Sequence, residues 1–570
     1  MSRRTAFVVA AGVTALALGA AAVGAVALLV RGHGRSSPGW SSGDQYLALD
    51  VGGEVAEEPA GGLGALFESR PPSLRSLVEA VDRAAKDPSV RGLVLRVGPL
   101  DVGWARVQDL REALVRFGRA GKPSWAHLEY AGNREYYLAT GCSRIAASPT
   151  ALLDVTGLAA EVTFYKGALD KLGVQAQFEG VGKYKNAPNQ FTETAFTEPH
   201  REQMEALVES LFDGYVKGVA ESRKLTPEKV RAIVDEGPFD AQRAKAAGLV
   251  DELLYRDQVE QKVPGRERLT PGRYVKASRG FSFGARPRIA LVYAVGDIVS
   301  GESQSSPLGG GMVGSDTVIR GLRQAVEDDS VKAVVLRVDS PGGSGTASDA
   351  IWREIGIARR RKPVVASMGD YAASGGYYIS MNSDAIVAQP GTITGSIGVF
   401  SGKFSLRGLY EKLGISEDVV QRGRYARLFS SSDPWDDAER QRVRALNVAF
   451  YDTFVTKASE GRKRKKDEIE AVAQGRVWTG QEALARGLVD RLGGLDAALA
   501  LARERARLGP AADVVVLPER KGFFETLMER QEEDVVGRAL GLRAARMLRW
   551  SAALSGSGPI ARLPFDLAVR

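Results

Sequence analysis

The sequence predicts an α/β protein in which one domain, built on a mostly parallel sheet, occurs twice in tandem. Two observations support this prediction. Amphipathic helical segments alternate with short, continuously apolar segments, which is typical of parallel strands buried on both faces. In addition, the order of segments in the first half of the 570 residues returns in the second half. Because solenoid repeats are only about 20–50 residues long, a repeat of this size indicates a duplicated domain.

The beginning of the chain has the composition of a membrane anchor. Residues 5–30 contain no charged side chain, and these 26 positions exceed the roughly 20 residues that a helix needs to cross a bilayer. The apolar region of a cleaved signal peptide is shorter, about 7–15 residues. We therefore expect one uncleaved transmembrane helix, and residues 1–45 form the predicted anchor and linker.

The overall composition narrows the class of protein. Hydrophobic residues make up 44% and charged residues 26% of the chain, as in a globular protein with two or more cored domains. The net charge of +8 is dispersed, without an aromatic-interleaved basic stripe, so we expect no nucleic-acid partner. The single cysteine, Cys142, excludes an intrachain disulfide. No His/Cys cluster with ligand spacing and no Walker-type phosphate loop occurs, so we expect no metal and no cofactor.

The two predicted units comprise residues 46–275 and residues 286–517. Matching segments recur with an offset of 241 residues, for example Leu95 and Leu336 within two similar strands. Residues 518–570 lie outside the repeat, and the sequence predicts no role for them.

Each unit repeats the same local pattern of helix and strand. Amphipathic helices are predicted over residues 73–85 and 315–327, each after a serine that we expect to cap it. Each helix leads into a strand rich in Val and Leu, over residues 93–97 and 333–338.

The two copies differ at the residues that could do chemistry. The second copy has Ser374 before two glycines, just after an apolar strand predicted over residues 363–367, and the aligned segment of the first copy contains no serine. Conversely, Lys185 of the first copy falls on an alanine of the second copy. Ser396 falls on a valine, and the paired glycines around Gly343 are also absent from the other copy. One copy thus keeps a candidate nucleophile and the other a candidate base.

A nucleophilic serine needs a base, and histidine does not supply it here. The three histidines are His33, His127 and His200, and none stands in a catalytic motif. A lysine that burial keeps neutral can take this role, because desolvation disfavours the ammonium form. Backbone N–H groups at consecutive glycines can hold the oxyanion that forms on the attacked carbonyl.

At these residues the chain resembles the long, duplicated form of the bacterial signal peptide peptidase family SppA, also called protease IV. The matching motifs span much of both units. They are Asp339-Ser340-Pro341-Gly342-Gly343, Ala373-Ser374-Gly375-Gly376-Tyr377-Tyr378, Gly395-Ser396-Ile397-Gly398, Gly182-Lys183-Tyr184-Lys185 and Gly475-Arg476-Val477-Trp478-Thr479-Gly480.

The resemblance implies a crotonase/Clp-like ββα superhelical fold for each unit. It also implies a serine endopeptidase with a Ser/Lys dyad completed across the two halves of one chain. In that dyad Ser374 is the nucleophile, Lys185 is the general base, and Ser396 orients the lysine. The N–H groups of Gly343 and Gly375 form the oxyanion hole, and no cofactor takes part.

The resemblance further implies where the enzyme works and on what. Its substrates are cleaved signal peptides, which are apolar leader peptides left in the membrane. The protein is expected to be a homo-oligomer, a tetramer, held in the bacterial inner membrane by its single N-terminal helix. The catalytic part is expected on the periplasmic face.

Two other functions remain open at this point. The chain could be a catalytically inactive, membrane-anchored scaffold that binds apolar peptides, although such a scaffold has no physical need for Ser374, Lys185 and both glycine turns. A crotonase-type acyl-CoA hydratase is the second alternative. It would normally use carboxylates where Ser374 stands, and it would have little use for a membrane anchor.

Overall fold

The computed structural model describes residues 44–58, 73–277, 286–305, 311–509, 512–519 and 560–562. The predicted transmembrane segment at residues 5–30 lies outside these ranges. Within them, no helix combines the length and the apolar character that crossing a bilayer requires.

The first unit is built on a mostly parallel sheet, in which β4 pairs antiparallel only with the short strand β6. Its central strands are apolar because helices cover the sheet. In spatial order the strands are β6 (Phe239–Asp240), β4 (Arg144–Asp154), β3 (Ser124–Gly132), β2 (Val90–Leu100), β1 (Gln45–Gly53) and β8 (Glu267–Leu269), with β7 (Glu252–Leu253) beside β4.

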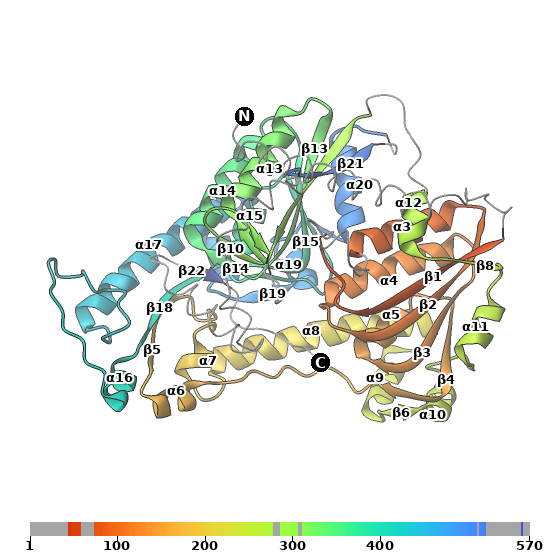
Figure 1. Cartoon of the computed structure of the whole chain (residues 1–570), viewed down its shortest axis with the longest axis horizontal. Coiled ribbons are helices and arrows are strands. Elements are labelled where there is room, and N and C mark those ends of the chain that lie inside the picture. Colours follow the sequence, from red (N-terminus) through yellow and green to blue (C-terminus); the bar gives the residue numbers. More distant parts are fainter. Residues whose placement is uncertain are drawn as a thin grey trace, which may run out of the picture.

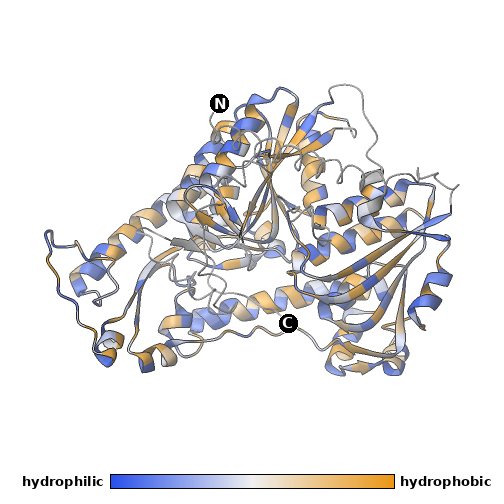
Figure 2. Cartoon of the chain, in the orientation of Figure 1, coloured by the Kyte–Doolittle hydropathy of each residue, from blue (hydrophilic) through white to orange (hydrophobic). Residues whose placement is uncertain are grey.

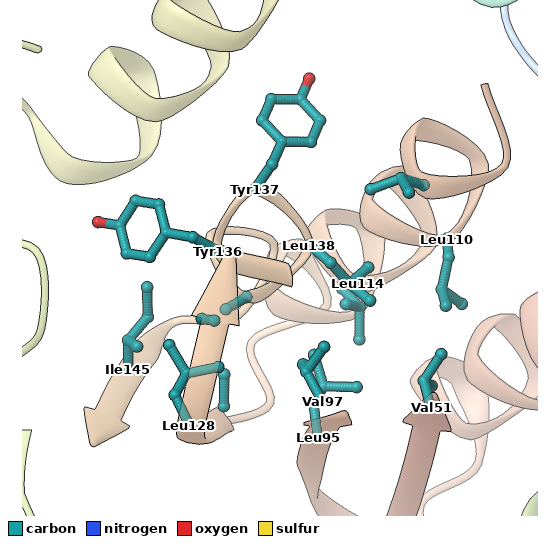
Figure 3. Packing of buried hydrophobic residues seen from close by; sticks show 14 of the residues in the cluster. Val51, Leu95, Val97, Leu110, Leu114, Leu128, Tyr136, Tyr137, Leu138 and Ile145 are labelled. Carbon is teal, nitrogen blue, oxygen red and sulfur yellow. The ribbon is translucent and has the colours of Figure 1, made fainter. Parts of the chain in front are cut away.

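Most helices of the first unit bury their apolar faces against this sheet. Two short helices, α6 and α7, instead contact the strand β5 (Gln175–Val181). Figure 3 shows Leu95 and Val97 of β2 packed beside Leu110 and Leu114 of α4. The helices are α3 (Leu74–Lys86), α4 (Trp104–Arg119), α5 (Asn133–Ala139), α6 (Lys166–Leu172), α7 (Asn189–Thr192), α8 (Glu198–Arg223), α9 (Pro227–Asp235), α10 (Ala241–Ala246), α11 (Arg256–Lys262) and α12 (Pro271–Ala277).

The second unit repeats this strand order, which confirms the predicted α/β class and the tandem arrangement. Its strands are β19 (Val477–Thr479), β17 (Ile393–Gly395), β15 (Val364–Ala373), β13 (Val331–Ser340), β9 (Arg288–Val295) and β21 (Asp513–Leu517), with β16 (Ala385–Ala388) beside β15 and β20 (Arg491–Leu492) beside β16. Its helices are α13 (Ser315–Glu327), α14 (Gly345–Ala358), α15 (Gly375–Ser380), α16 (Arg407–Leu413), α17 (Asp437–Arg462), α18 (Lys466–Val472), α19 (Gly480–Ala485) and α20 (Leu495–Arg505). In Figure 2 the strands of both units are largely apolar, while the helices alternate between apolar and polar residues.

The predicted serine caps have different outcomes in the two units. Ser73 is the N-cap of α3, and its side chain accepts a hydrogen bond from the Ser76 N–H. In the second unit the N-cap is Gly314, without a side-chain bond, and Ser315 is already the first helical residue. The prediction is therefore right for Ser73 and wrong for Ser315, because strand β12 runs directly into α13 and leaves the serine inside the helix.

A third sheet joins the two units. Its strands are β11 (Gln304–Ser305), β12 (Gly311–Gly314), β10 (Asp297–Val299), β14 (Gly342–Ser344), β22 (Ile560–Arg562), β18 (Val399–Ser405) and β5 (Gln175–Val181). The first-unit strand β5 pairs antiparallel with the second-unit strand β18 along its whole length. In Figure 1 these two strands form an arm at the left, with α6 and α16 at its tip.

Candidate active site

Ser374 lies at a sharp turn between a strand and a helix. Strand β15 continues to Ala373, beyond the predicted strand at residues 363–367, and α15 begins at Gly375. Between them Ser374 has φ 55° and ψ −112°, a backbone conformation that is rare for a residue with a side chain. Its N–H donates a hydrogen bond to the Gly395 carbonyl at 2.8 Å, and the residue is fully buried. Strain of this kind is often held at functional sites by the surrounding structure.

The pairing of β5 with β18 brings Lys185 to the same place. Val181, the last residue of β5, pairs with Val399, the first residue of β18. In an antiparallel pair, the chain that follows one strand runs beside the chain that precedes the other. The residues after Val181 therefore run beside those before Val399, and Lys185 comes to lie next to Ser396.

The Lys185 amine contacts three oxygen atoms in the second unit. Its Nζ lies 2.7 Å from Ser374 Oγ, 2.9 Å from Ser396 Oγ and 3.0 Å from the Ser396 carbonyl oxygen. Lys185 is 5% exposed, and both serines are fully buried. This burial lowers the pKa of the Lys185 amine well below its ordinary value of 10.5, because a charged amine loses its hydration in such a place.

The two glycines predicted for the oxyanion hole lie on neighbouring elements. Gly343 is the middle residue of β14 and has φ 150°, and Gly375 is the first residue of α15. A Cβ at position 343 would lie 2.2 Å from the Ile298 carbonyl oxygen, so no other residue fits there. Helix α15 contacts β14. A Cβ at Gly376 would lie 2.5 Å from the carbonyl oxygen of Ser340, just before β14.

A strand from the end of the chain lies beside Gly343. In the third sheet β22 sits between β14 and β18, and Gly343 pairs antiparallel with Ala561. Strand β22 also pairs with β18 through Ile560 and Phe400. The sequence predicts no role for this part of the chain, because three residues outside the repeat carry no periodic signal.

Gly475 supports the lysine and was also missed as a site residue. It has φ 76°, and a Cβ there would lie 2.6 Å from both Cβ and N of Lys185. The neighbouring Gln474 carbonyl accepts the Tyr184 N–H at 2.9 Å. Gly475 begins the last motif that carried the family resemblance, but its role depends on a contact between units that the sequence does not reveal.

The two histidines in the described ranges lie elsewhere. His127 is on β3 of the first sheet, with its Nε2 3.2 Å from the Leu254 carbonyl oxygen. His200 is on α8, with its ring 4.7 Å from that of Phe196. Lysine is therefore the basic side chain that the structure brings to Ser374.

This chain is similar to the members of one protein family and to several known proteins. The profile of "Peptidase family S49" matches residues 116–268 and 357–509, once in each unit. "Protease 4" of Salmonella typhi is 34% identical over 507 residues, which cover 84% of this chain and 80% of that protein.

Two further relatives give a similar picture. "Serine protease SPPA, chloroplastic" of Arabidopsis thaliana is 34% identical over 449 residues, which cover 76% of this chain and 66% of that protein. "Protease 4" of Haemophilus influenzae is 32% identical over 449 residues, covering 74% of this chain and 71% of that protein. With a family match in both units and relatives that extend across most of the chain, the protein belongs to peptidase family S49, the family of the protease IV and SppA serine peptidases.

Proposed function

We propose that this protein is a serine endopeptidase with a Ser/Lys dyad, in which Ser374 is the nucleophile and Lys185 the general base. The observation that carries the proposal is the 2.7 Å contact between Lys185 Nζ and Ser374 Oγ. Each residue comes from a different unit, and each has lost its equivalent in the other unit. A nucleophile within hydrogen-bond reach of a base, with a third group orienting that base, is the usual arrangement for covalent catalysis.

The neutral form of the amine can make all three of these contacts. A neutral amine has two N–H donors and one lone pair, so it can satisfy three partners. The Ser396 carbonyl oxygen can only accept, and it takes one N–H; the Ser396 hydroxyl takes the other. The lone pair is then left to accept the O–H of Ser374. Ser396 thereby orients the lysine for proton abstraction.

The reaction follows from this arrangement. Lys185 Nζ takes the proton of Ser374 as Oγ attacks the scissile carbonyl carbon. The resulting ammonium gives this proton to the leaving amine nitrogen, and an acyl-enzyme remains. A water molecule then loses a proton to Nζ and attacks the ester carbonyl, and the proton returns to Ser374 Oγ. The N–H groups of Gly343 and Gly375 are the proposed donors to the oxyanion in both tetrahedral intermediates.

The proposed substrate is an extended, apolar peptide. Strand β14 carries Gly343, and its edge already pairs with an extended segment of this chain, β22. A peptide that adds to this edge as a strand would gain main-chain hydrogen bonds and would pass close to Ser374. The resemblance to the SppA family and the charge-free segment at residues 5–30 support signal peptides left in a membrane as the physiological substrates.

The proposed setting is the periplasmic face of the bacterial inner membrane, with residues 5–30 as the anchor. A homo-oligomer, in particular a tetramer, is the proposed assembly. Large apolar side chains exposed at and near the arm tip support such an assembly, because exposed apolar patches often mark interaction surfaces. Leu172, Leu413 and Val420 are 54%, 63% and 89% exposed.

Cleavage of a fluorogenic apolar peptide by the purified full-length protein tests the dyad. Ser374→Ala and Lys185→Ala are expected to abolish turnover. Lys183→Ala is a matched control, since Lys183 lies two residues away, is fully exposed and stacks on Tyr184; it is expected to keep wild-type turnover. Wild-type turnover by either dyad variant would refute the dyad. Peptide binding without cleavage by the wild-type protein would favour the inactive scaffold instead.

A further inference from the structure

A single arginine of the first unit reaches two carboxylates of the second unit. Arg106 is in the first turn of α4, which contacts β15 at the boundary between the units. Its guanidinium forms an ion pair with Asp339, and its Nε lies 2.9 Å from Asp370 Oδ2. Asp339 and Asp370 are 6% and 4% exposed, so solvent screens these contacts little.

The two carboxylates stand at equivalent places in the two segments that build the proposed site. Asp339 precedes Gly343 by four residues, and Asp370 precedes Ser374 by four residues. Asp339 also joins the segments directly, since its Oδ1 accepts the Tyr371 N–H at 2.9 Å. The position of the Arg106 guanidinium therefore affects both the turn that carries Gly343 and the segment that carries Ser374.

Asp370 is also fixed to the first unit through its other contacts. It accepts the Gly103 N–H at 2.9 Å and the Arg106 N–H at 3.0 Å. Gly103, the N-cap of α4, makes no side-chain capping bond, so Asp370 supplies the cap from the other unit, where the helix dipole favours an anion. A Cβ at Gly103 would lie 2.3 Å from Asp370 Cγ, so only glycine leaves room for this carboxylate.

The duplication shows that this arrangement is specific to the junction between the units. At the 241-residue offset, Arg106 corresponds to Ala347 and Asp339 corresponds to Gly98. Asp370 corresponds to Glu129, which is exposed on the first sheet. The cation survives only in the first copy and the buried carboxylate pair only in the second. Lys185 and Ser374 are divided between the copies in the same way.

Acidic groups are in excess around Arg106. Glu57 lies 3.5 Å from Arg106 Nε, and it also pairs with the fully buried Arg337 at 2.6 Å. Burial raises the pKa of Asp370, and Arg106 opposes this rise. Without Arg106, Asp339 and Asp370 would face each other as buried carboxylates with no cation between them, and they would repel each other.

We propose that Arg106 is a positioning residue of the peptidase site, which sets the distance between the Gly343 turn and Ser374 by holding Asp339 and Asp370 together. This proposal rests on the proposed function, because it gives Arg106 a role in that same site. Arg106 itself does not touch the reacting atoms. It would act through the backbone of the two segments, and displacement by about 1 Å in such a site lowers the rate by about 10²-fold.

Steady-state kinetics of Arg106→Gln in the full-length protein test the proposal. We expect kcat to fall by about 10²-fold while KM stays within about threefold, since the arginine orients reacting groups and does not bind peptide. Labelling of Ser374 by a fluorophosphonate should slow in parallel, because this reaction also needs the nucleophile and the oxyanion donors. Arg106→Lys should give an intermediate kcat, because an ammonium keeps the charge but lacks the planar fork of a guanidinium.

Arg116→Gln is the matched control. Arg116 lies on the same helix and also reaches the second unit, with its Nη1 2.9 Å from Asp496 Oδ2, but it contacts neither Asp339 nor Asp370. Its kcat and its labelling rate should stay within about twofold of wild type, because a partly exposed ion pair contributes little. An equal loss of kcat in both variants would overturn the proposal, since it would indicate a general effect on the contact between units.

Other outcomes also test whether Arg106 positions the site. A folded Arg106→Gln protein with wild-type kcat would overturn the proposal and leave the dyad intact. If Arg106→Gln does not fold, Asp339→Asn replaces it: the amide oxygen still accepts the Tyr371 N–H, but the charge opposite Arg106 is lost. The same fall in kcat supports the proposal, and wild-type kcat overturns it. A wild-type protein without turnover would instead contradict the proposed function.

Discussion

Replacement of Lys185 by methionine tests the neutral lysine in two ways. Methionine has a similar length and no charge, so it fills the same space without accepting a proton. Loss of a general base lowers the rate by about 10²- to 10⁴-fold, and we expect kcat to fall within that range. The strained backbone at Ser374 is held by its own bond to Gly395 and should persist.

The same variant has a predicted effect on stability that depends on pH. Burial lowers the pKa of Lys185 in the folded protein well below 10.5, whereas the unfolded chain keeps the ordinary value. Between these two pKa values the unfolded wild-type chain binds one more proton than the folded one. Raising the pH through this window therefore stabilises the wild type, by about 1.4 kcal/mol per pH unit. The Lys185→Met protein lacks this contribution.

Denaturant unfolding of both proteins at several pH values, from about pH 8 to about pH 10, measures the effect. Over the part of this range that lies between the folded-state and unfolded-state pKa values of Lys185, the difference in unfolding free energy should change in favour of the wild type by about 1.4 kcal/mol for each pH unit. Lys183→Met is a control that should show no slope in this direction, because the contact with Tyr184 raises the pKa of Lys183 above its ordinary value, so this lysine stays protonated in both the folded and the unfolded chain over this range. A difference that does not vary with pH would mean that the folded protein keeps Lys185 charged. A variant that keeps kcat within about threefold of wild type would refute its role as the base.

Three further predictions concern the surroundings of the dyad. Ser396→Ala removes one of the three partners of the amine, and kcat should fall by about 10- to 100-fold, as expected for a buried donor left without a partner; an unchanged kcat would contradict the orienting role. Gly475→Ala should lower kcat by about 10²-fold, because the added Cβ would displace Lys185. Gly423→Ala is the control: Gly423 also has a positive φ, +92°, but an added Cβ would have nothing within 4 Å, so this variant should retain wild-type kcat. Deletion of residues 560–570 removes β22 from the edge of β14 and frees this edge for a peptide. Both kcat/KM for peptides and the rate of fluorophosphonate labelling should then rise. Lower values of either would mean that β22 supports the site.

Much of the architecture could be predicted from the sequence because it depends on local patterns. Continuous apolar strands between amphipathic helices predicted the α/β class, and the 241-residue offset predicted the tandem units. The family resemblance was also correct. Local prediction failed where a neighbouring element changed the start of a helix, as at Ser315, which lies inside α13 and not at its cap.

The candidate site could be predicted only as a set of residues. Ser374 and Lys185 could be recognised because each is absent from the equivalent position of the other copy, and such differences between duplicated units are visible in the sequence. Their roles remain the proposal made above. Gly475, Arg106 and β22 were not predicted, since each acts through a contact between segments far apart in the chain.

The sequence by itself determined the duplicated α/β plan, the family, and the division of candidate residues between the two copies. These features can be recognised from the local periodicity of apolar residues and by comparing one half of the chain with the other. Only the tertiary structure decided that Lys185 meets Ser374, since that contact depends on the register of β5 against β18. It alone also decided that Arg106 lies between two carboxylates of the other unit. The physical reason is that strand pairing and buried ion pairs are selected by packing across the whole chain, and no short stretch of residues contains that information.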